Sequence, residues 1–504
     1  MIDLGELSAR ARRAGAAVAL TAALALGATV PAVAALPAVA WADEEASFSA
    51  DQPPALASAA ALLVDTDTGT VLFEQDADAQ RYPASTTKIM TALVVLEHAN
   101  LDDVVTVEES DFDEVTADSS VAGLKPGDTL TVRDLLGCLL VPSGNDASYV
   151  LARYVGGGDW HAFVDMMNER AAELGCTNTH FANPCGLHDD NHYTSARDLA
   201  LIFEAALAHP EFVEAASSAT WDLPATPVNP ARTLKSTDLL ITPSSPVYAE
   251  GLVTAAKTGS TPEAGRCLVA SAEKDGMHLV GVTLGAGYWT ADAQGVTGNF
   301  TDMRALFDWG FGAWVTGPVV SAGDVLAAAD VTLSSDGKKV DATATDEVVA
   351  TVPRGTELAD LTVEPSWPAS FQAPVEKGQE LGRARVSLDG RVLGQVGLAS
   401  AAAMELSIPA FVLWWLSDPV HAVIVVAVVV ALLVVVGVTG SRRSRRKRER
   451  LRLEANGNRV MATAYRSERL RVAEKPGAGK GGAAGKGGKH ASVGKHAAPK
   501  HGAR

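Results

Sequence analysis

The stretch that decides the fold is Ser85-Thr86-Thr87-Lys88, which follows Pro83 and opens an apolar run that extends to about residue 99. The periodicity of that run predicts a helix. Lys88 would lie one helical turn beyond Ser85 on the same face, so its amine could take the proton of the Ser85 hydroxyl. The backbone N–H of Ser85, at the positive end of the helix, would help to stabilise an oxyanion. The pair therefore indicates nucleophilic chemistry, although Ser85 alone would be an ordinary helix cap.

Two further polar clusters follow in the chain. Ser143-Gly144-Asn145 interrupts an apolar helical segment, and such a break presents a hydroxyl and a carboxamide. Lys257-Thr258-Gly259 precedes a β-type run; on an edge strand it would place an ammonium and a hydroxyl beside the nucleophile, and Gly259 would admit a substrate backbone. The ammonium of Lys257 would also lower the pKa of Lys88. Each cluster alone is compatible with a simple turn, but the ordered set is typical of serine acyl-transferases.

The two ends of the chain predict where this chemistry takes place. Residues 1–42 combine early arginines, an apolar stretch and small residues, which predicts a signal peptide cleaved after Ala40 or Ala42; the alternative is an uncleaved anchor. Residues 420–438 are almost entirely apolar and just long enough to cross about 30 Å of hydrocarbon. The arginine-rich residues 442–448 mark the cytoplasmic side. The body of the protein is therefore expected outside the cell, anchored in the cell membrane by a single span.

The charge is distributed unevenly along the chain. Residues 441–504 carry 19 Lys and Arg against four Glu, which gives +15, and residues 1–42 carry +1. Because the whole chain has a net charge of −18, residues 43–440 carry −34. So acidic a region argues against nucleic acid as a partner. Residues 441–504 are predicted to form a basic, disordered cytoplasmic tail, which either attracts anionic lipid headgroups or only stops transfer.

The exported region is too long for one core and predicts two domains, 43–318 and 319–405. In the first, long helical segments alternate with short strands, which indicates an α+β or α/β domain. The second has short β-type runs separated by glycine turns, which indicates a small β domain. The helical segments are 89–99, 132–154, 160–174 and 195–208, and the strands of the first domain include 60–65, 70–74 and 267–272. The strands of the second are expected near 331–333, 348–352, 358–363, 384–388 and 392–398.

Residues 55–315 resemble the serine-type D-alanyl-D-alanine carboxypeptidases, the low-molecular-mass penicillin-binding proteins. Besides the three clusters, the segments that carry the resemblance are 84–91, 140–147, 167–171, 181–184, 192–196 and 308–311. Residues 320–400, with Pro374-Val375-Glu376-Lys377-Gly378-Gln379, are similar to the β-rich C-terminal domain of these enzymes. The resemblance implies the α+β penicillin-recognising serine transferase fold, an antiparallel sheet packed with helices plus an all-helical lobe, followed by a small all-β domain and one transmembrane helix.

The resemblance also implies a role for each site residue. Ser85 would attack the carbonyl between two D-alanines of a peptidoglycan stem peptide, and Lys88 would accept its proton. Ser143 would pass a proton to the departing D-alanine. Substrate binding would fall to Asn145, Lys257, Thr258, Gly259 and Ser260, with Thr258 on the terminal carboxylate and the N–H groups of Ser85 and Ser260 forming the oxyanion hole. β-Lactam antibiotics would acylate the same serine, and neither a cofactor nor a metal is implied.

Departures from the family pattern leave alternatives open. Residues 287–300 lack the arginine that often helps to bind the terminal carboxylate, and Arg266 is either a substitute or a solvated surface charge. A β-lactamase shares the motifs, but its class A form has Ser-Asp-Asn where Gly144 stands here. A non-catalytic wall-binding scaffold is the third possibility, and the intact motifs argue against it.

Four cysteines, Cys138, Cys176, Cys185 and Cys267, lie in the exported region. Export permits disulfides, and the short separation makes Cys176–Cys185 the best single guess among three possible pairings. Cys138 and Cys267 lie in apolar runs and are expected to be buried free thiols. His188 and His192 flank two aspartates, for which we favour a polar loop over a metal site.

Overall fold

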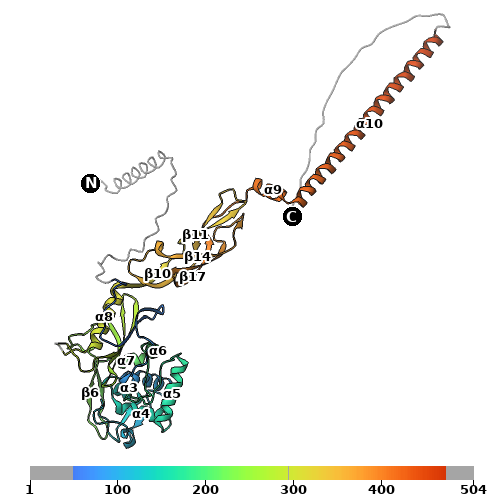
Figure 1. Cartoon of the computed structure of the whole chain (residues 1–504). Coiled ribbons are helices and arrows are strands. Elements are labelled where there is room, and N and C mark those ends of the chain that lie inside the picture. The colour runs from blue at the N-terminus through green and yellow to red at the C-terminus, as the bar shows by residue number, and fades with distance from the viewer. Residues whose placement is uncertain (1–48, 293–294, 473–504) are drawn as a thin grey trace, which may run out of the picture. The chain divides into compact units, whose positions relative to one another are not determined.

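A computed structural model of the chain describes residues 49–292 and 295–472 (Figure 1). The predicted signal peptide, residues 1–42, lies outside the described residues. The chain divides into two compact units, one that ends at Ser407 and one that begins at Ile408.

The first unit is organised around a five-stranded antiparallel sheet with the strand order β2-β1-β9-β8-β7. Its strands are β1 (Ala60–Asp65), β2 (Thr70–Gln75), β7 (Val253–Thr261), β8 (Gly265–Lys274) and β9 (Met277–Ala286). Both faces of β1 are buried: Leu62 and Val64 join the core on one side, and Ala61 and Leu63 join the core on the other. This is why β1 is an unbroken apolar run rather than an alternating one. The Lys-Thr-Gly cluster lies on β7, which is an edge strand as predicted.

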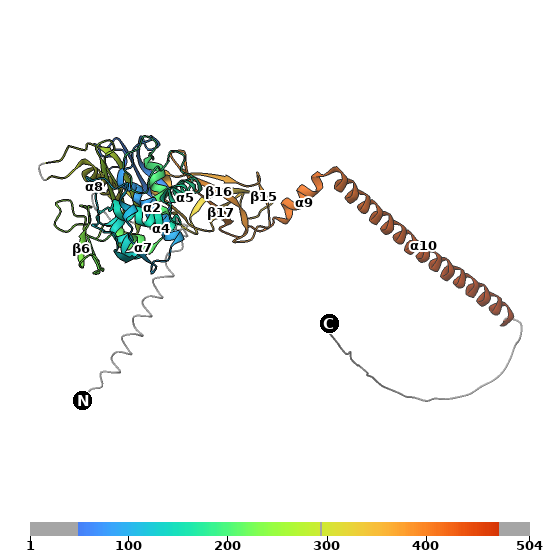
Figure 2. The same ribbon diagram turned by 90° about the horizontal axis from the view of Figure 1, so that it is seen from below.

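Helices cover the two faces of the sheet. On one side α8 packs against β8 and β9, and on the other α6 packs against β1 and β9. The remaining helices form the helical lobe, in which α4 packs against α3 and α5, and α7 packs against α3 (Figures 1 and 2). The helices are α2 (Lys88–His98), α3 (Val132–Leu140), α4 (Asn145–Val155), α5 (Trp160–Glu173), α6 (Ala196–Leu207), α7 (Pro210–Ala216) and α8 (Gly298–Ala313). Two small two-stranded antiparallel sheets complete this domain, β3 (Val104–Thr106) with β4 (Thr129–Thr131), and β5 (Thr220–Leu223) with β6 (Arg232–Lys235).

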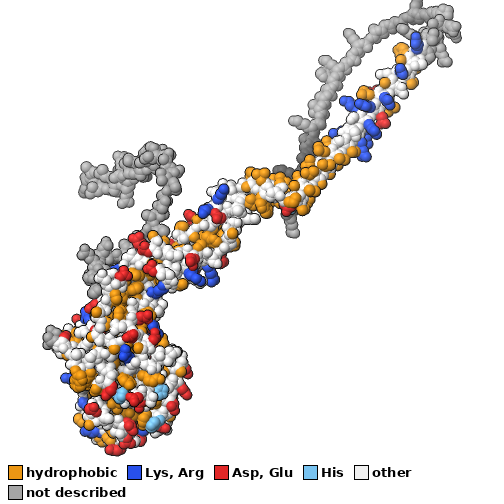
Figure 3. Space-filling view, in the orientation of Figure 1, with side chains coloured by type: hydrophobic (Ala, Val, Ile, Leu, Met, Phe, Trp, Pro, Cys, Tyr) orange, Lys and Arg blue, Asp and Glu red, His pale blue; other side chains and the backbone are white. Residues whose placement is uncertain are grey.

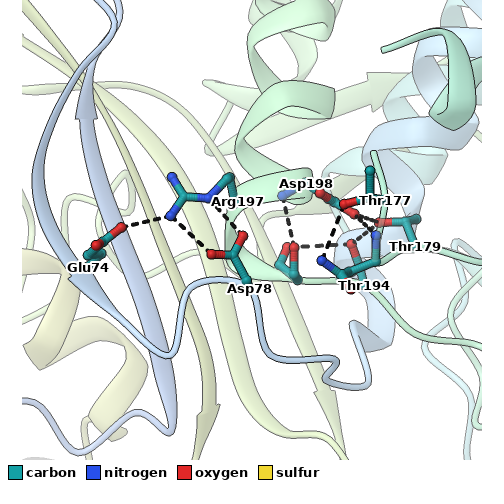
Figure 4. A network of polar contacts seen from close by, with 9 residues as sticks. Glu74, Asp78, Thr177, Thr179, Thr194, Arg197 and Asp198 are labelled. Carbon is teal, nitrogen blue, oxygen red and sulfur yellow. Dashed lines mark hydrogen bonds and ion pairs between the residues drawn. The ribbon is translucent and has the colours of Figure 1, made fainter. Parts of the chain in front are cut away.

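The start of α6 is fixed by carboxylates (Figure 4). Asp198, in its first turn, accepts hydrogen bonds from the backbone N–H of Asn178 at 2.7 Å and from the Thr179 hydroxyl at 2.8 Å. Arg197, beside it, forms ion pairs with Glu74 at 2.7 Å and with Asp78 at 2.8 Å. The Asp198 contacts hold the segment at Asn178 and Thr179 against the start of α6, and the Arg197 ion pairs hold α6 against β2 and the turn that follows it.

Residues 314–406 form an all-β domain with its own core. A six-stranded sheet has the order β14-β16-β17-β12-β11-β15, and β10 pairs with β13 beside it. The strands are β10 (Trp314–Val320), β11 (Val325–Thr332), β12 (Lys339–Ala344), β13 (Val348–Pro353), β14 (Thr362–Ser366), β15 (Phe371–Gln372), β16 (Glu380–Leu388) and β17 (Arg391–Ser400). Buried valines, alanines and leucines from these strands fill the core.

A buried carboxylate joins the two domains of the first unit. Asp65, at the end of β1, is fully buried, and its Oδ1 accepts the backbone N–H of Asp67 and of Thr68 at 3.0 Å. Its Oδ2 accepts the hydroxyl of Thr316 from β10. The Thr351 hydroxyl of β13 then lies 2.6 Å from that of Thr68. Polar groups of the all-β domain thus complete the hydrogen bonding of a charge that belongs to the central sheet.

The second unit is helical and comprises α9 (Ile408–Ser417) and α10 (Pro419–Val472). Figure 3 shows hydrophobic side chains over α9 and the first part of α10, followed by Lys and Arg. By length and composition, α10 can cross a membrane. The prediction of disorder from residue 441 is wrong as far as residue 472, because the helix continues through that segment. Arg, Leu, Ala and Glu have high helix propensity, and a helix that extends an existing one avoids the cost of nucleation.

We expect the Asp65→Ala variant to lose about 3 kcal/mol of stability, because several partly buried donors lose a charged acceptor. The free energy of unfolding, from denaturant titration followed by near-ultraviolet circular dichroism, tests this. Asp330→Ala serves as the control, since Asp330 is exposed and its ion pair with Lys339 at 4.0 Å is worth about 0–1 kcal/mol. Equal stability of the two variants would contradict the role assigned to Asp65.

Candidate active site

The nucleophile candidate lies on the turn that leads into α2. Ser85 belongs to a short 3-10 turn, η1 (Ala84–Thr87), and Lys88 is the first residue of the helix. The Lys88 Nζ lies 2.9 Å from the Ser85 Oγ. Ala84, directly before the serine, has a φ of +49°, a left-handed conformation that costs a non-glycine residue free energy. The sequence spacing thus places hydroxyl and amine in contact, as predicted.

Lys88 is fully buried, and acceptors from two other parts of the fold bind it. Its Nζ donates to the Oδ1 of Asn145 at 2.7 Å and to the backbone carbonyl of Cys185 at 2.8 Å, in addition to Ser85. Burial lowers the pKa of Lys88 from 10.5 to about 8, and the carboxylate of Asp146 opposes this shift. The amine can therefore lose its proton near neutral pH, as a general base requires.

The Ser-x-Asn cluster forms the connection between α3 and α4. Ser143 has a φ of +64°, and Asn145 begins α4. A Cβ on Gly144 would lie 2.7 Å from the Cys138 carbonyl oxygen, so only glycine fits between the two helices. The Asn145 carboxamide bridges Lys88 and the hydroxyl of Ser119, to which its Nδ2 donates at 2.9 Å. The helix break therefore brings the Asn145 carboxamide into contact with Lys88.

The third cluster brings a second buried amine to the site. The Nζ of Lys257, on β7, donates to the Ser143 Oγ at 2.9 Å and to the Thr258 carbonyl oxygen at 2.9 Å. Burial, and next the positive charge of Lys88, hold the pKa of Lys257 well below its usual value, while Asp238 acts in the opposite direction. Two serine hydroxyls thus each contact a buried lysine, Ser85 with Lys88 and Ser143 with Lys257.

Gly259 also has a packing role that the sequence did not predict. A Cβ at this position would lie 2.7 Å from the Pro83 carbonyl oxygen and 3.0 Å from the Thr86 backbone nitrogen. The glycine therefore lets β7 pack closely against the turn that carries Ser85. Thr258 lies beside it with its hydroxyl 2.6 Å from that of Thr237, and the Ser260 side chain is exposed. The three sequence clusters consequently meet at one place.

Sequence reasoning missed Asp146, Ser119 and the Cys185 carbonyl group. Asp146 is fully buried, and its carboxylate accepts the backbone N–H of Ala122 at 2.9 Å and of Leu124 at 3.0 Å. It thereby fixes the segment that carries Ser119 beside Asn145. An acidic residue in the first turn of a helix is a recognisable signal. No such sequence signal marks the residues that bind Asp146, and none marks the backbone carbonyl of Cys185.

The predicted disulfide between Cys176 and Cys185 is wrong, because all four cysteines are free. The Sγ of Cys176 lies 3.6 Å from the Asp198 carbonyl oxygen, whereas that of Cys185 is buried 3.4 Å from the Asn183 Oδ1. The two thiols therefore have separate surroundings despite their short separation in sequence. Cys138 and Cys267 are buried free thiols, as predicted.

His192 supports the nucleophile turn rather than lying in a polar loop. It is buried, its Nδ1 accepts the Ala182 N–H at 3.0 Å, and its Nε2 therefore carries the proton that it donates to the Thr87 hydroxyl at 2.7 Å. Burial lowers its pKa to about 3, so the ring stays neutral. Within the described residues, no group of three His, Cys, Asp or Glu could hold a metal ion.

The fold and these contacts define an active-site serine peptidase of the penicillin-recognising type. Residues 47–287 match the D-alanyl-D-alanine carboxypeptidase family, and residues 314–406 match the penicillin-binding protein 5 C-terminal domain. The chain belongs to the D-alanyl-D-alanine carboxypeptidase family, the low-molecular-mass penicillin-binding proteins.

Individual relatives cover most of the first unit. D-alanyl-D-alanine carboxypeptidase DacF of Bacillus subtilis is 31% identical over 347 residues, 68% of this chain and 85% of the relative. DacC of Escherichia coli is 34% identical over 361 residues, 69% of this chain and 85% of the relative. Among solved structures, penicillin-binding protein 5 of Haemophilus influenzae aligns with a TM-score of 0.53 at 29% identity, covering 70% of this chain and 99% of that one.

We expect Gly259→Ala to slow acylation at Ser85 by more than about tenfold, because its Cβ would push β7 away from the nucleophile turn. The rate of labelling by a fluorescent penicillin measures this. Glu263→Ala is the matched control, since Glu263 is exposed in the turn at the end of the same strand. Equal labelling rates for both variants and the unmodified chain would show that the close approach of β7 is not required.

Proposed function

We propose that this chain is a membrane-anchored carboxypeptidase that removes the terminal D-alanine from peptidoglycan stem peptides through an acyl-enzyme at Ser85. The observation that carries the proposal is the 2.9 Å contact between the Ser85 hydroxyl and the fully buried Lys88 amine. Family membership supplies the substrate class. Asn145 contacts Lys88, and Ser143 contacts Lys257 on the strand that also carries Thr258, Gly259 and Ser260.

In the acylation step, the neutral amine of Lys88 accepts the proton of Ser85 as its Oγ attacks the carbonyl carbon between the two D-alanines. The N–H groups of Ser85 and Ser260 stabilise the resulting oxyanion. The C–N bond then breaks, and the departing amine takes a proton from Ser143. Lys257 replaces that proton, because its Nζ lies 2.9 Å from the Ser143 Oγ.

In the second step, water hydrolyses the ester. Lys88 releases the proton that it gained and can then accept one from the attacking water, which yields the shortened peptide and free Ser85. Asn145 holds the amide of the acyl group with the carboxamide that also contacts Lys88. In a β-lactam the cleaved amide belongs to a ring, so the leaving nitrogen remains attached and the acyl-enzyme persists. This supports the antibiotics as inhibitors of the same site.

The membrane proposal rests on α10 and its flanks. The apolar first part of this helix is long enough to cross a bilayer, and the arginines that follow favour the cytoplasmic side. The catalytic domain would then lie outside the cytoplasm, where peptidoglycan is found, with the N-terminal segment acting as the export signal.

Labelling by fluorescent penicillin, together with D-alanine release from a pentapeptide ending in D-Ala-D-Ala, tests the function. We expect a long-lived adduct and D-alanine release, both lost in Ser85→Ala and retained in Ser217→Ala, whose serine is exposed on α7's C-terminal end. Rapid turnover of penicillin without D-alanine release would indicate a β-lactamase. No adduct and no release from the unmodified chain would indicate a scaffold.

The pH dependence of acylation should follow Lys88. Because only its neutral form accepts a proton, the rate should rise with pH and level off above a pKa of about 8. Lys88→Arg should be inactive throughout, since a guanidinium does not lose its proton in this range. The folded chain also binds fewer protons than the unfolded chain between about pH 8 and 10.5, so this residue makes stability rise with pH there. An acylation rate already level below about pH 6 would contradict Lys88 as the base.

A further inference from the structure

The loop that follows β6 reaches the Lys-Thr-Gly strand and adds a second hydroxyl to it. The Oγ1 of Thr237 lies 2.6 Å from the Oγ1 of Thr258, and both side chains are accessible to solvent. The Thr237 N–H donates to the Val141 carbonyl oxygen at 3.2 Å, just before Ser143. Thr237 therefore lies between the second and third clusters, although it belongs to neither.

A buried carboxylate, that of Asp238, follows Thr237 directly in the chain. Asp238 is 3% exposed, and its Oδ1 accepts the Leu240 N–H at 2.7 Å, while its Oδ2 has no hydrogen-bond partner among the described residues. Its negative charge acts on Lys257, whose Nζ contacts the Thr258 carbonyl. Asp238 is thus a positioning residue: it fixes the backbone of the loop through Leu240 and places a countercharge near the Lys257 ammonium.

The arginine that often helps to bind the terminal carboxylate in this family is missing from residues 287–300. Arg266, the possible substitute, contacts a different group. Arg266 lies across from Ser260 in the β7–β8 pairing. Its guanidinium stacks 4.5 Å from the centre of the Tyr288 ring, and its Nε donates to the Tyr288 carbonyl oxygen at 3.3 Å. Lys257, whose Nζ contacts the Thr258 carbonyl oxygen, is a cation that the described contacts place beside the threonine pair.

We infer that Thr237 is a further substrate-binding residue, and that its hydroxyl and that of Thr258 together bind the terminal carboxylate of the peptide, with Lys257 as the neighbouring cation. A hydroxyl can rotate its hydrogen to suit the acceptor. Without substrate one of the two threonines donates to the other; with substrate, each donates to one carboxylate oxygen. The inference rests on the proposed carboxypeptidase function.

This arrangement links carboxylate recognition to catalysis. A carboxylate at the threonine pair favours the charged form of Lys257. Lys257 contacts Ser143, the residue that hands a proton to the departing D-alanine in the proposed mechanism. A peptide with a free C-terminus would therefore bind more tightly and also supply the charge that keeps a proton on Lys257. An internal peptide bond lacks that carboxylate, so the pair favours carboxypeptidase over endopeptidase substrates.

The test compares a pentapeptide ending in D-Ala-D-Ala with its C-terminal carboxamide, using the full-length chain in detergent micelles. In Thr237→Val we expect kcat/KM for the free acid to fall about 10- to 100-fold, as for loss of a hydrogen bond to a charged group, mainly through KM. The carboxamide should be nearly unaffected, so the preference for the free acid should shrink by the same factor. Thr237→Ser should restore the preference.

Thr242→Val is the matched control, because the Thr242 hydroxyl supports the same loop by donating to the Asp238 carbonyl oxygen at 2.6 Å. Acylation rates with benzylpenicillin and its methyl ester give a second measure of the preference that needs no turnover. The inference would be overturned if Thr237→Val kept the preference for the free acid over the carboxamide or methyl ester. It would also be overturned if the variant lost the same factor in rate with both compounds of each pair. Neither result would affect the carboxypeptidase function. An unmodified chain that neither labels nor releases D-alanine would overturn the proposed function itself.

Discussion

The active site depends on the burial of one amine, that of Lys88. A buried ammonium is costly unless its donors are all satisfied. Here the acceptors are the Ser85 hydroxyl, the Asn145 carboxamide and the Cys185 carbonyl. They come from the turn before α2, the start of α4 and the loop before α6, so the fold must bring three distant segments to one nitrogen. Burial of this amine also lowers the pKa of Lys88 to about 8, near the range in which it can act as a base.

Close backbone contacts keep those segments in place, and several would not tolerate another residue. Gly186 has a φ of +86°, and a Cβ there would lie 1.9 Å from the Ala84 carbonyl oxygen. Gly259 packs β7 on the same turn from the other side. Ala84 and Ser143 adopt left-handed conformations that cost free energy. The buried sheet and helical lobe supply the stability that offsets this strain, which is concentrated where the reacting groups must be held.

The sequence predicted well what depends on local pattern and poorly what depends on distant contacts. The apolar run of β1 and the periodicity of α2 gave element bounds within a residue, and the spacing of Ser85 and Lys88 gave their contact. A backbone carbonyl such as that of Cys185 leaves no trace in the residue type. The predicted disulfide failed for a related reason: a separation of only eight intervening residues between Cys176 and Cys185 says nothing about where each thiol points. Composition likewise could not show that the basic segment continues the α10 helix.

The site contains two buried lysines, and their mutual repulsion gives the proposed mechanism a direction. The positive charge of Lys88 is one of the causes that lower the pKa of Lys257. The titrations of such neighbouring groups are coupled, so a proton gained by one lysine lowers the pKa of the other. When Lys88 takes the proton of Ser85, Lys257 therefore becomes a stronger acid, and its contact with Ser143 leads that proton toward the departing amine. Asp238 moderates the effect by favouring charge on Lys257. The two Ser–Lys contacts thus act as the two halves of one proton transfer, which requires that both amines be buried and close enough to sense each other.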